Sequence, residues 1–206
     1  MRKFISAAIV LVILVAAYWG WALAGTAQLA SVASEGDAEA VMQRVDLPAL
    51  RRSLGGQIAH AYLEQNPQFK KLLPLEQGFV GSVGGGAADE LLRELLTPEN
   101  IAALLNKGRV GLPKAGAPDT GTLWRMPPLG EALRAGPLQA LMNSHFDGPL
   151  SFVVDLDSGE GRYRVHLHLS GSTWRLSGLD LPEQVSARLA REIAERVGGL
   201  TERRGG

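Results

Sequence analysis

The chain has 206 residues, of which 46% are apolar, and it balances 21 basic against 21 acidic residues. Without Arg2 and Lys3 the remainder carries 19 basic against 21 acidic residues, so it lacks the clustered basic excess that nucleic-acid binding requires. Cysteine is absent, which excludes disulfides, thiolate zinc sites, cysteine nucleophiles and the lipidated cysteine of a bacterial lipoprotein. We therefore expect no nucleic-acid partner.

The N-terminus has the pattern of a membrane anchor. Arg2 and Lys3 precede the uncharged residues 4–24, and a helix of that length spans roughly 30 Å, about one hydrocarbon core. The next basic residue is Arg44, so the positive-inside rule leaves the N-terminus in the cytoplasm and the rest outside. We predict a single-pass protein of the bacterial inner membrane, with residues 1–24 as anchor and residues 25–206 as a periplasmic domain.

A cleaved signal peptide is the alternative. Residues 22–24, Ala-Leu-Ala before Gly25, fit the small-residue pattern of a cleavage site. Aromatic residues are unusual just before such a site and fit an interfacial belt instead; here they are Tyr18, Trp19 and Trp21. The helical pattern also continues without proline to about Glu35. These observations favour an uncleaved, signal-like anchor, and both alternatives place the domain on the same side.

Helical patterns follow the anchor. Asp37 and Asp46 are N-cap candidates. After Asp46, apolar residues recur at helical spacing, namely Leu50, Leu54, Ile58 and Ala61. This spacing predicts an amphipathic helix over 48–63. Residues 66–86 and 108–128 are irregular or rich in Gly and Pro, so we expect flexible loops near both. A further helix is predicted at about 87–96, and another begins after Thr97, which is its cap. A short helical stretch is predicted at about 129–142, with an interruption near Gly136.

The C-terminal third changes to the two-residue alternation of strands. A four-residue turn after residue 157 would place Asp157 opposite Arg162 and Asp155 opposite Arg164, which pairs charges and aligns the apolar faces. A third strand over 174–179 follows, and a final helix is expected to end at residues 198–199, which are Gly-Gly. The predicted fold class is α+β: an N-terminal transmembrane helix, then helices packed on a C-terminal antiparallel sheet, with a C-terminal helix.

Several sequence blocks resemble one family. They are Tyr18-x-x-Trp21, Leu29, Gly36-Asp37, residues 45–54 (VDLPALRRSL), residues 97–105 (TPENIAALL) and residues 174–182 (WRLSGLDLP). They resemble domain of unknown function 2939 (DUF2939), an uncharacterised family of single-span bacterial envelope proteins. The departure is Ala22, where the family pattern leads us to expect proline. The resemblance implies a membrane-anchored extracytoplasmic domain without an established activity, and the order of elements is analogous to the nuclear-transport-factor-like cone.

The strongest metal candidates are His166 and His168, two imidazoles on one face of a strand. A metal ion needs a third and usually a fourth ligand, and the expected cross-strand neighbours Val153 and Ser151 supply no strong one. We therefore predict a polar strand surface with no metal and no cofactor.

Three interpretations of function remain. An enzyme would need a carboxylate or imidazole in an apolar cavity, whereas Asp155 and Asp157 fall on the polar face, so a hydrolase or isomerase is the weakest. A carrier would hold a lipid or small apolar ligand in a cone-shaped cavity lined by inward residues such as Phe152, Tyr163 and Trp174. If these bulky side chains fill the cone instead, the domain is a non-enzymatic interaction module that contacts envelope proteins or the cell wall, which we favour.

Overall fold

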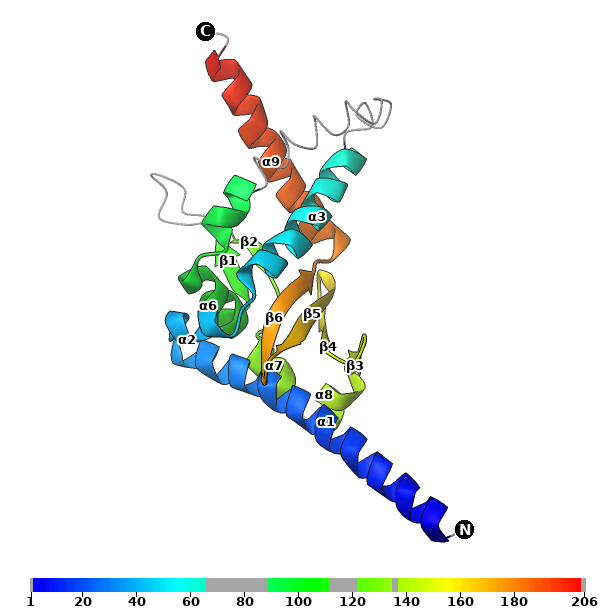
Figure 1. Ribbon diagram of the computed structural model, residues 1–206. Coiled ribbons are helices and arrows are strands. Elements are labelled where there is room, and N and C mark those ends of the chain that lie inside the picture. The colour runs from blue at the N-terminus through cyan, green and yellow to red at the C-terminus, as the bar shows by residue number, and fades with distance from the viewer. Residues whose placement is uncertain (1, 66–88, 112–121, 135–136, 205–206) are drawn as a thin grey trace.

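The computed structural model describes residues 2–65, 89–111, 122–134 and 137–204 (Figure 1). It confirms the α+β class: helices pack against a four-stranded antiparallel sheet, and a C-terminal helix follows the sheet. The long first helix passes beneath the body, and its N-terminal half projects away from it (Figure 1). The predicted loop at 66–86 lies outside the described residues.

Helix α1 (Arg2–Glu35) is continuous and has two different halves. Side chains 3–17 are all exposed, whereas Ala22, Leu29 and Ala33 are fully buried in the domain core. The helix ends at Gly36, whose φ of 76° is the left-handed conformation that glycine adopts without strain. The expected continuation to Glu35 is confirmed, and the predicted boundary between residues 24 and 25 falls inside this helix.

The helices after α1 begin at the predicted caps. Asp37 precedes α2 (Ala38–Gln43) and accepts a hydrogen bond from the backbone N–H of Ala40. Asp46 does the same for Ala49 at the start of α3 (Leu47–Gln65), whose predicted apolar stripe is buried. Residues 89–95 are helical, and Thr97 caps α6 (Pro98–Lys107).

The prediction of a loop over 108–128 is wrong at its two ends. Strands β1 (Arg109–Gly111) and β2 (Thr122–Arg125) form a two-stranded antiparallel sheet, while residues 112–121 lie outside the description. Strands this short are too brief to show an alternating pattern in a Gly- and Pro-rich stretch. The next prediction is confirmed, because α7 (Leu129–Arg134) and α8 (Pro137–Met142) are separate helices.

The main sheet has the order β3-β4-β5-β6. Its strands are β3 (Ser144–Phe146), β4 (Ser151–Ser158), β5 (Gly161–Ser170) and β6 (Thr173–Asp180). The predicted register is confirmed, with Asp157 opposite Arg162 and Asp155 opposite Arg164. The sequence did not predict β3.

A β-bulge interrupts the pairing of β5 with β6. His168 faces Arg175, but His166 faces Gly178, so Ser177 is the extra residue on β6. A bulge reverses the facing of every later side chain in its strand. Leu179 is therefore buried and Asp180 lies on the polar face.

The outer edge of β6 is covered. The backbone N–H of Asp46 donates to the Leu176 carbonyl, and the Leu176 N–H donates to the Arg44 carbonyl. Further along, the Gln57 side chain of α3 donates to the Leu179 carbonyl and accepts from the Leu181 N–H. These bonds remove the free edge to which another strand could pair.

The last helix, α9 (Glu183–Arg204), buries Val185 and Leu189. The predicted end at residues 198–199 is wrong, because the helix continues through both glycines. A glycine inside an exposed helix costs only about 1 kcal/mol relative to alanine, and the residues that follow include helix-forming Leu, Glu and Arg.

Candidate functional site

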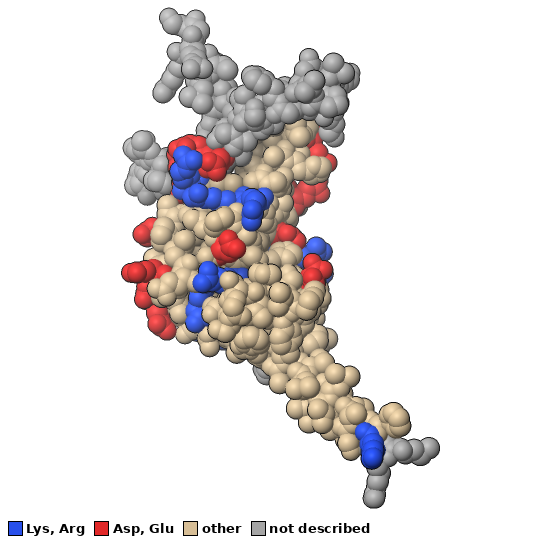
Figure 2. All heavy atoms as spheres, in the orientation of Figure 1, with Lys and Arg blue, Asp and Glu red and all other residues tan. Residues whose placement is uncertain are grey.

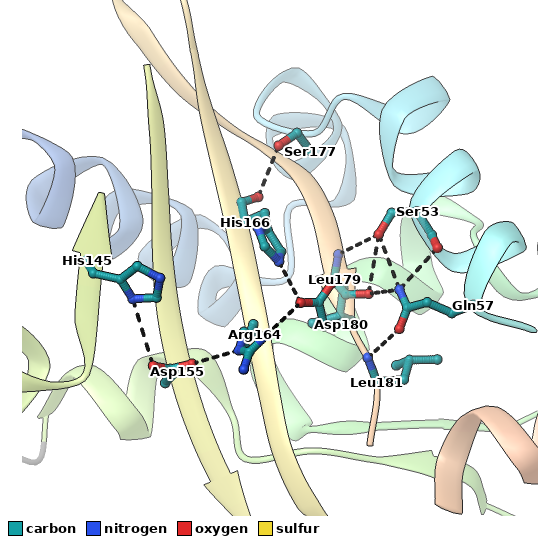
Figure 3. A network of polar contacts seen from close by, with 10 residues as sticks. All are labelled: Ser53, Gln57, His145, Asp155, Arg164, His166, Ser177, Leu179, Asp180 and Leu181. Carbon is teal, nitrogen blue, oxygen red and sulfur yellow. Dashed lines mark hydrogen bonds and ion pairs between the residues drawn. The ribbon is translucent and has the colours of Figure 1, made fainter. Parts of the chain in front are cut away.

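The solvent-facing side of the main sheet carries a connected group of charged and imidazole side chains (Figure 3). We call this group the polar strip and define it as His145, Asp155, Arg164, His166 and Asp180. Its members come from all four strands, β3 to β6. It is the main cluster of titratable groups among the described residues of the sheet.

Arg164 lies at the centre of the polar strip. Its Nε is 3.5 Å from Asp155 Oδ1, and its Nη1 is 3.7 Å from Asp180 Oδ2. His145 Nδ1 approaches the other oxygen of Asp155 at 3.9 Å, and His166 Nε2 lies 3.0 Å from Asp180 Oδ2. Each histidine contact is an ion pair only when that imidazole is protonated.

The contact with His166 is the largest cause that lowers the pKa of Asp180 below its usual value, and the charge of Arg164 lowers it further. Burial acts in the opposite direction but is outweighed. Asp180 is therefore ionised at neutral pH. Asp155 is shielded more strongly, with 20% of its side chain exposed, and it lies between His145 on β3 and Arg164 on β5.

Sequence reasoning found Asp155, Arg164 and His166 but missed His145 and Asp180. Without the bulge, Asp180 would face Tyr163 and point into the core. A signal was present in the sequence, because the apolar positions of this stretch change from even numbers, Trp174 and Leu176, to odd numbers, Leu179 and Leu181. A break in alternation at a Ser-Gly pair indicates a bulge. His145 was missed because β3 has only three residues.

His168 is exposed and belongs to no such contact. Its cross-strand neighbour is Ser151 and that of His166 is Val153, as predicted. Among the described residues, no group of three or more His, Asp or Glu side chains is placed to hold a metal ion.

The three candidates for a ligand cavity lie in the hydrophobic core. Phe152, Tyr163 and Trp174 are buried. The Tyr163 hydroxyl donates to the Arg125 carbonyl at 2.5 Å, and burial, followed by the charge of Glu160, raises its pKa. The cavity between α3, α6 and the sheet measures about 10 Å³, at the lower limit for one water molecule.

Among the described residues, hollows also lie outside the core, and two of them have different linings. One, of about 590 Å³, is lined by both polar and apolar residues. Its lining includes Glu160 and Arg188, whose side chains form an ion pair at 2.9 Å and so offset each other's charge. The other is an apolar groove of about 660 Å³ between α1 and Leu141 of α8. Its lining on α1 is Leu11, Val12, Val15, Ala16, Trp19, Gly20 and Leu23.

The fold defines an α+β domain built onto one helix that is long and apolar enough to cross a membrane. The family described as "Protein of unknown function (DUF2939)" matches residues 11–104, so this part of the chain is similar to that family. The resemblance predicted from the sequence is thereby confirmed; the block at 174–182 lies outside the matched residues. No curated protein and no solved structure matches the chain.

Proposed function

We propose that this protein is a membrane-anchored, extracytoplasmic interaction module, in which α1 is the anchor and the polar strip contacts a protein partner in the bacterial envelope. The observation that carries the proposal is the combination of a filled core with a structured polar face. Phe152, Tyr163 and Trp174 are buried in the core, and the cavity between α3, α6 and the sheet measures about 10 Å³. The polar strip, in contrast, presents both signs of charge in fixed positions.

The mixed charges indicate the chemistry of the partner. Two carboxylates, one guanidinium and two imidazoles offer donors and acceptors side by side, which suits a polar protein surface better than a polyanion. The charged side chains alternate over the body in Figure 2 without forming a patch of one sign on that face. An apolar cargo has less support, since the interior cavity holds about 10 Å³.

Site-specific photocrosslinking in intact cells tests the module. We expect a photoreactive residue at Arg162, beside the polar strip, to give a discrete protein adduct, and one at His60 on α3 to give none; both positions are exposed. Arg164→Glu should abolish the adduct because it reverses the central charge of the strip. Arg93→Glu, which disrupts an exposed pair on another helix, should leave it intact.

Adducts that persist in Arg164→Glu, or that form equally at position 60, would contradict this role for the polar strip. A lipid-sized adduct in place of a protein would favour the carrier.

A further inference from the structure

The large apolar side chains that stay exposed outside α1 are gathered at one place. Among the described residues they are Leu141 and Met142 at the end of α8 and Leu150 in the loop before β4, with exposures of 38%, 80% and 47%. Leu141 lines the apolar groove with α1 residues 11–23. We call this underside, formed by Leu141, Met142 and Leu150, the apolar base.

The apolar base is fixed to α1 at a defined height. The Tyr18 hydroxyl donates to the carbonyl of Pro149, next to Leu150. Trp19 Nε1 donates to Ser144 Oγ at 3.3 Å, two residues after Met142. The Tyr18 ring also stacks on Phe146 with centroids 5.1 Å apart. These contacts mean that the depth of α1 in a membrane also sets the depth of the base.

The free part of α1 is too short to span a bilayer by itself. Residues 3–17 are exposed, and as a helix they cover roughly 22 Å, whereas the hydrocarbon core is about 30 Å thick. The difference of roughly 8 Å corresponds to about five more helical residues, which are residues 18–22. Those are the residues to which the apolar base is attached.

We propose that the apolar base is seated in the lipid of the leaflet next to the domain, with acyl chains occupying the groove between α1 and α8. This inference rests on the proposed anchoring by α1. The groove is continuous with the exposed apolar half of α1, which Figure 2 shows as a projection without charge between its tip and the body. Asp147 is exposed in the same loop, and because a carboxylate is costly in hydrocarbon, we expect this side chain to lie at the headgroup edge of the base while Leu150 enters the lipid.

The absence of cysteine allows a direct test with the full chain in phospholipid nanodiscs. Single variants Met142→Cys and Leu150→Cys carry a nitrobenzoxadiazole fluorophore, with Ile9→Cys as the position inside the anchor and His60→Cys as the position far from it. Replacing the lipids by lipids with brominated acyl chains should reduce fluorescence at 142 and 150 nearly as much as at 9. Fluorescence at 60 should not change.

The outcomes separate the two proposals. Suppose that the variants have the melting midpoint of the parent and that position 9 is quenched but positions 142 and 150 are not. This result would overturn the seated base, while the proposed anchoring by α1 would still hold. Loss of quenching at 9 as well would overturn the anchoring itself. Quenching at 142 and 150 that disappears in Leu141→Glu, while position 9 stays quenched, would support the groove as the lipid contact.

Discussion

At the scale of single residues, Asp180 is the side chain whose position and pKa depend on several neighbouring residues. It is placed by the bulge, contacted by His166 at 3.0 Å and approached by Arg164. Its pKa is lower in the folded state than the usual value. A carboxyl group of this kind stabilises the fold above its unfolded pKa, and this contribution is lost as the pH falls through the folded pKa.

Asp180→Asn should therefore destabilise the protein at neutral pH. Because the side chain is 39% exposed, we expect a loss below about 1 kcal/mol, which corresponds to a drop of at most about 4 °C in the melting midpoint. The difference from the parent should shrink as the pH falls below about 4, near the unfolded pKa of aspartate, because both proteins then lack the charge. Thermal melts in detergent across pH measure this.

Asp89→Asn, which removes a carboxylate from an exposed helix pair, is the matched control and should shift the midpoint less. An unchanged midpoint for Asp180→Asn at neutral pH, or a difference that grows in acid, would contradict the assigned role of Asp180.

At the scale of elements, the central contact is that of α1 with the sheet. Gly25 lies where a Cβ atom would come within 2.8 Å of the Cβ and Cδ1 atoms of Trp174. Trp174 in turn packs against Tyr18, Trp21 and Phe152 with ring centroids about 6 Å apart. The aromatic residues predicted to form an interfacial belt are therefore shared with the core, although Trp21 remains 42% exposed.

Gly25→Val should push α1 away from Trp174. Overpacking of this kind typically costs about 1–3 kcal/mol, so we expect a clearly lower melting midpoint. Gly20→Val is a control in the same helix, because a Cβ there meets nothing within 4 Å. Equal effects of the two substitutions would show that the close approach at Gly25 is not what sets the helix position.

At the scale of the whole molecule, the continuity of α1 bears on the choice between anchor and signal peptide. Cleavage after Ala24 would divide the helix beside Gly25 and remove Ala22, Tyr18 and Trp19, which contact the domain. Since these contacts fix the helix to the sheet, they support an anchor that is retained.

We expect a reporter that is active only outside the cytoplasm to be active when fused after Gly206. The fusion should sediment with membranes, and intact mass analysis should find residues 1–24 still attached. A soluble product that begins at Gly25 would favour the signal peptide, and an inactive, membrane-bound fusion would reverse the orientation.

The sequence alone determined what depends on neighbours along the chain. Apolar run length predicted α1, cap residues predicted the starts of α2, α3 and α6, and alternation with a short turn predicted the register of β4 with β5. These features follow from local hydrogen bonding and from the side-chain periods of helices and strands, so the pattern of residues suffices to predict them.

Only the tertiary structure decided what depends on contacts between distant segments. The bulge that turns Asp180 outward, the three-residue strand that supplies His145, and the packing of α1 on Trp174 leave weak or no periodic signals. The same holds for the filled core and for the gathering of Leu141, Met142 and Leu150 beside α1. Whether a side chain fills a space or lines one is set by packing among many elements at once, and no single stretch of sequence contains that information.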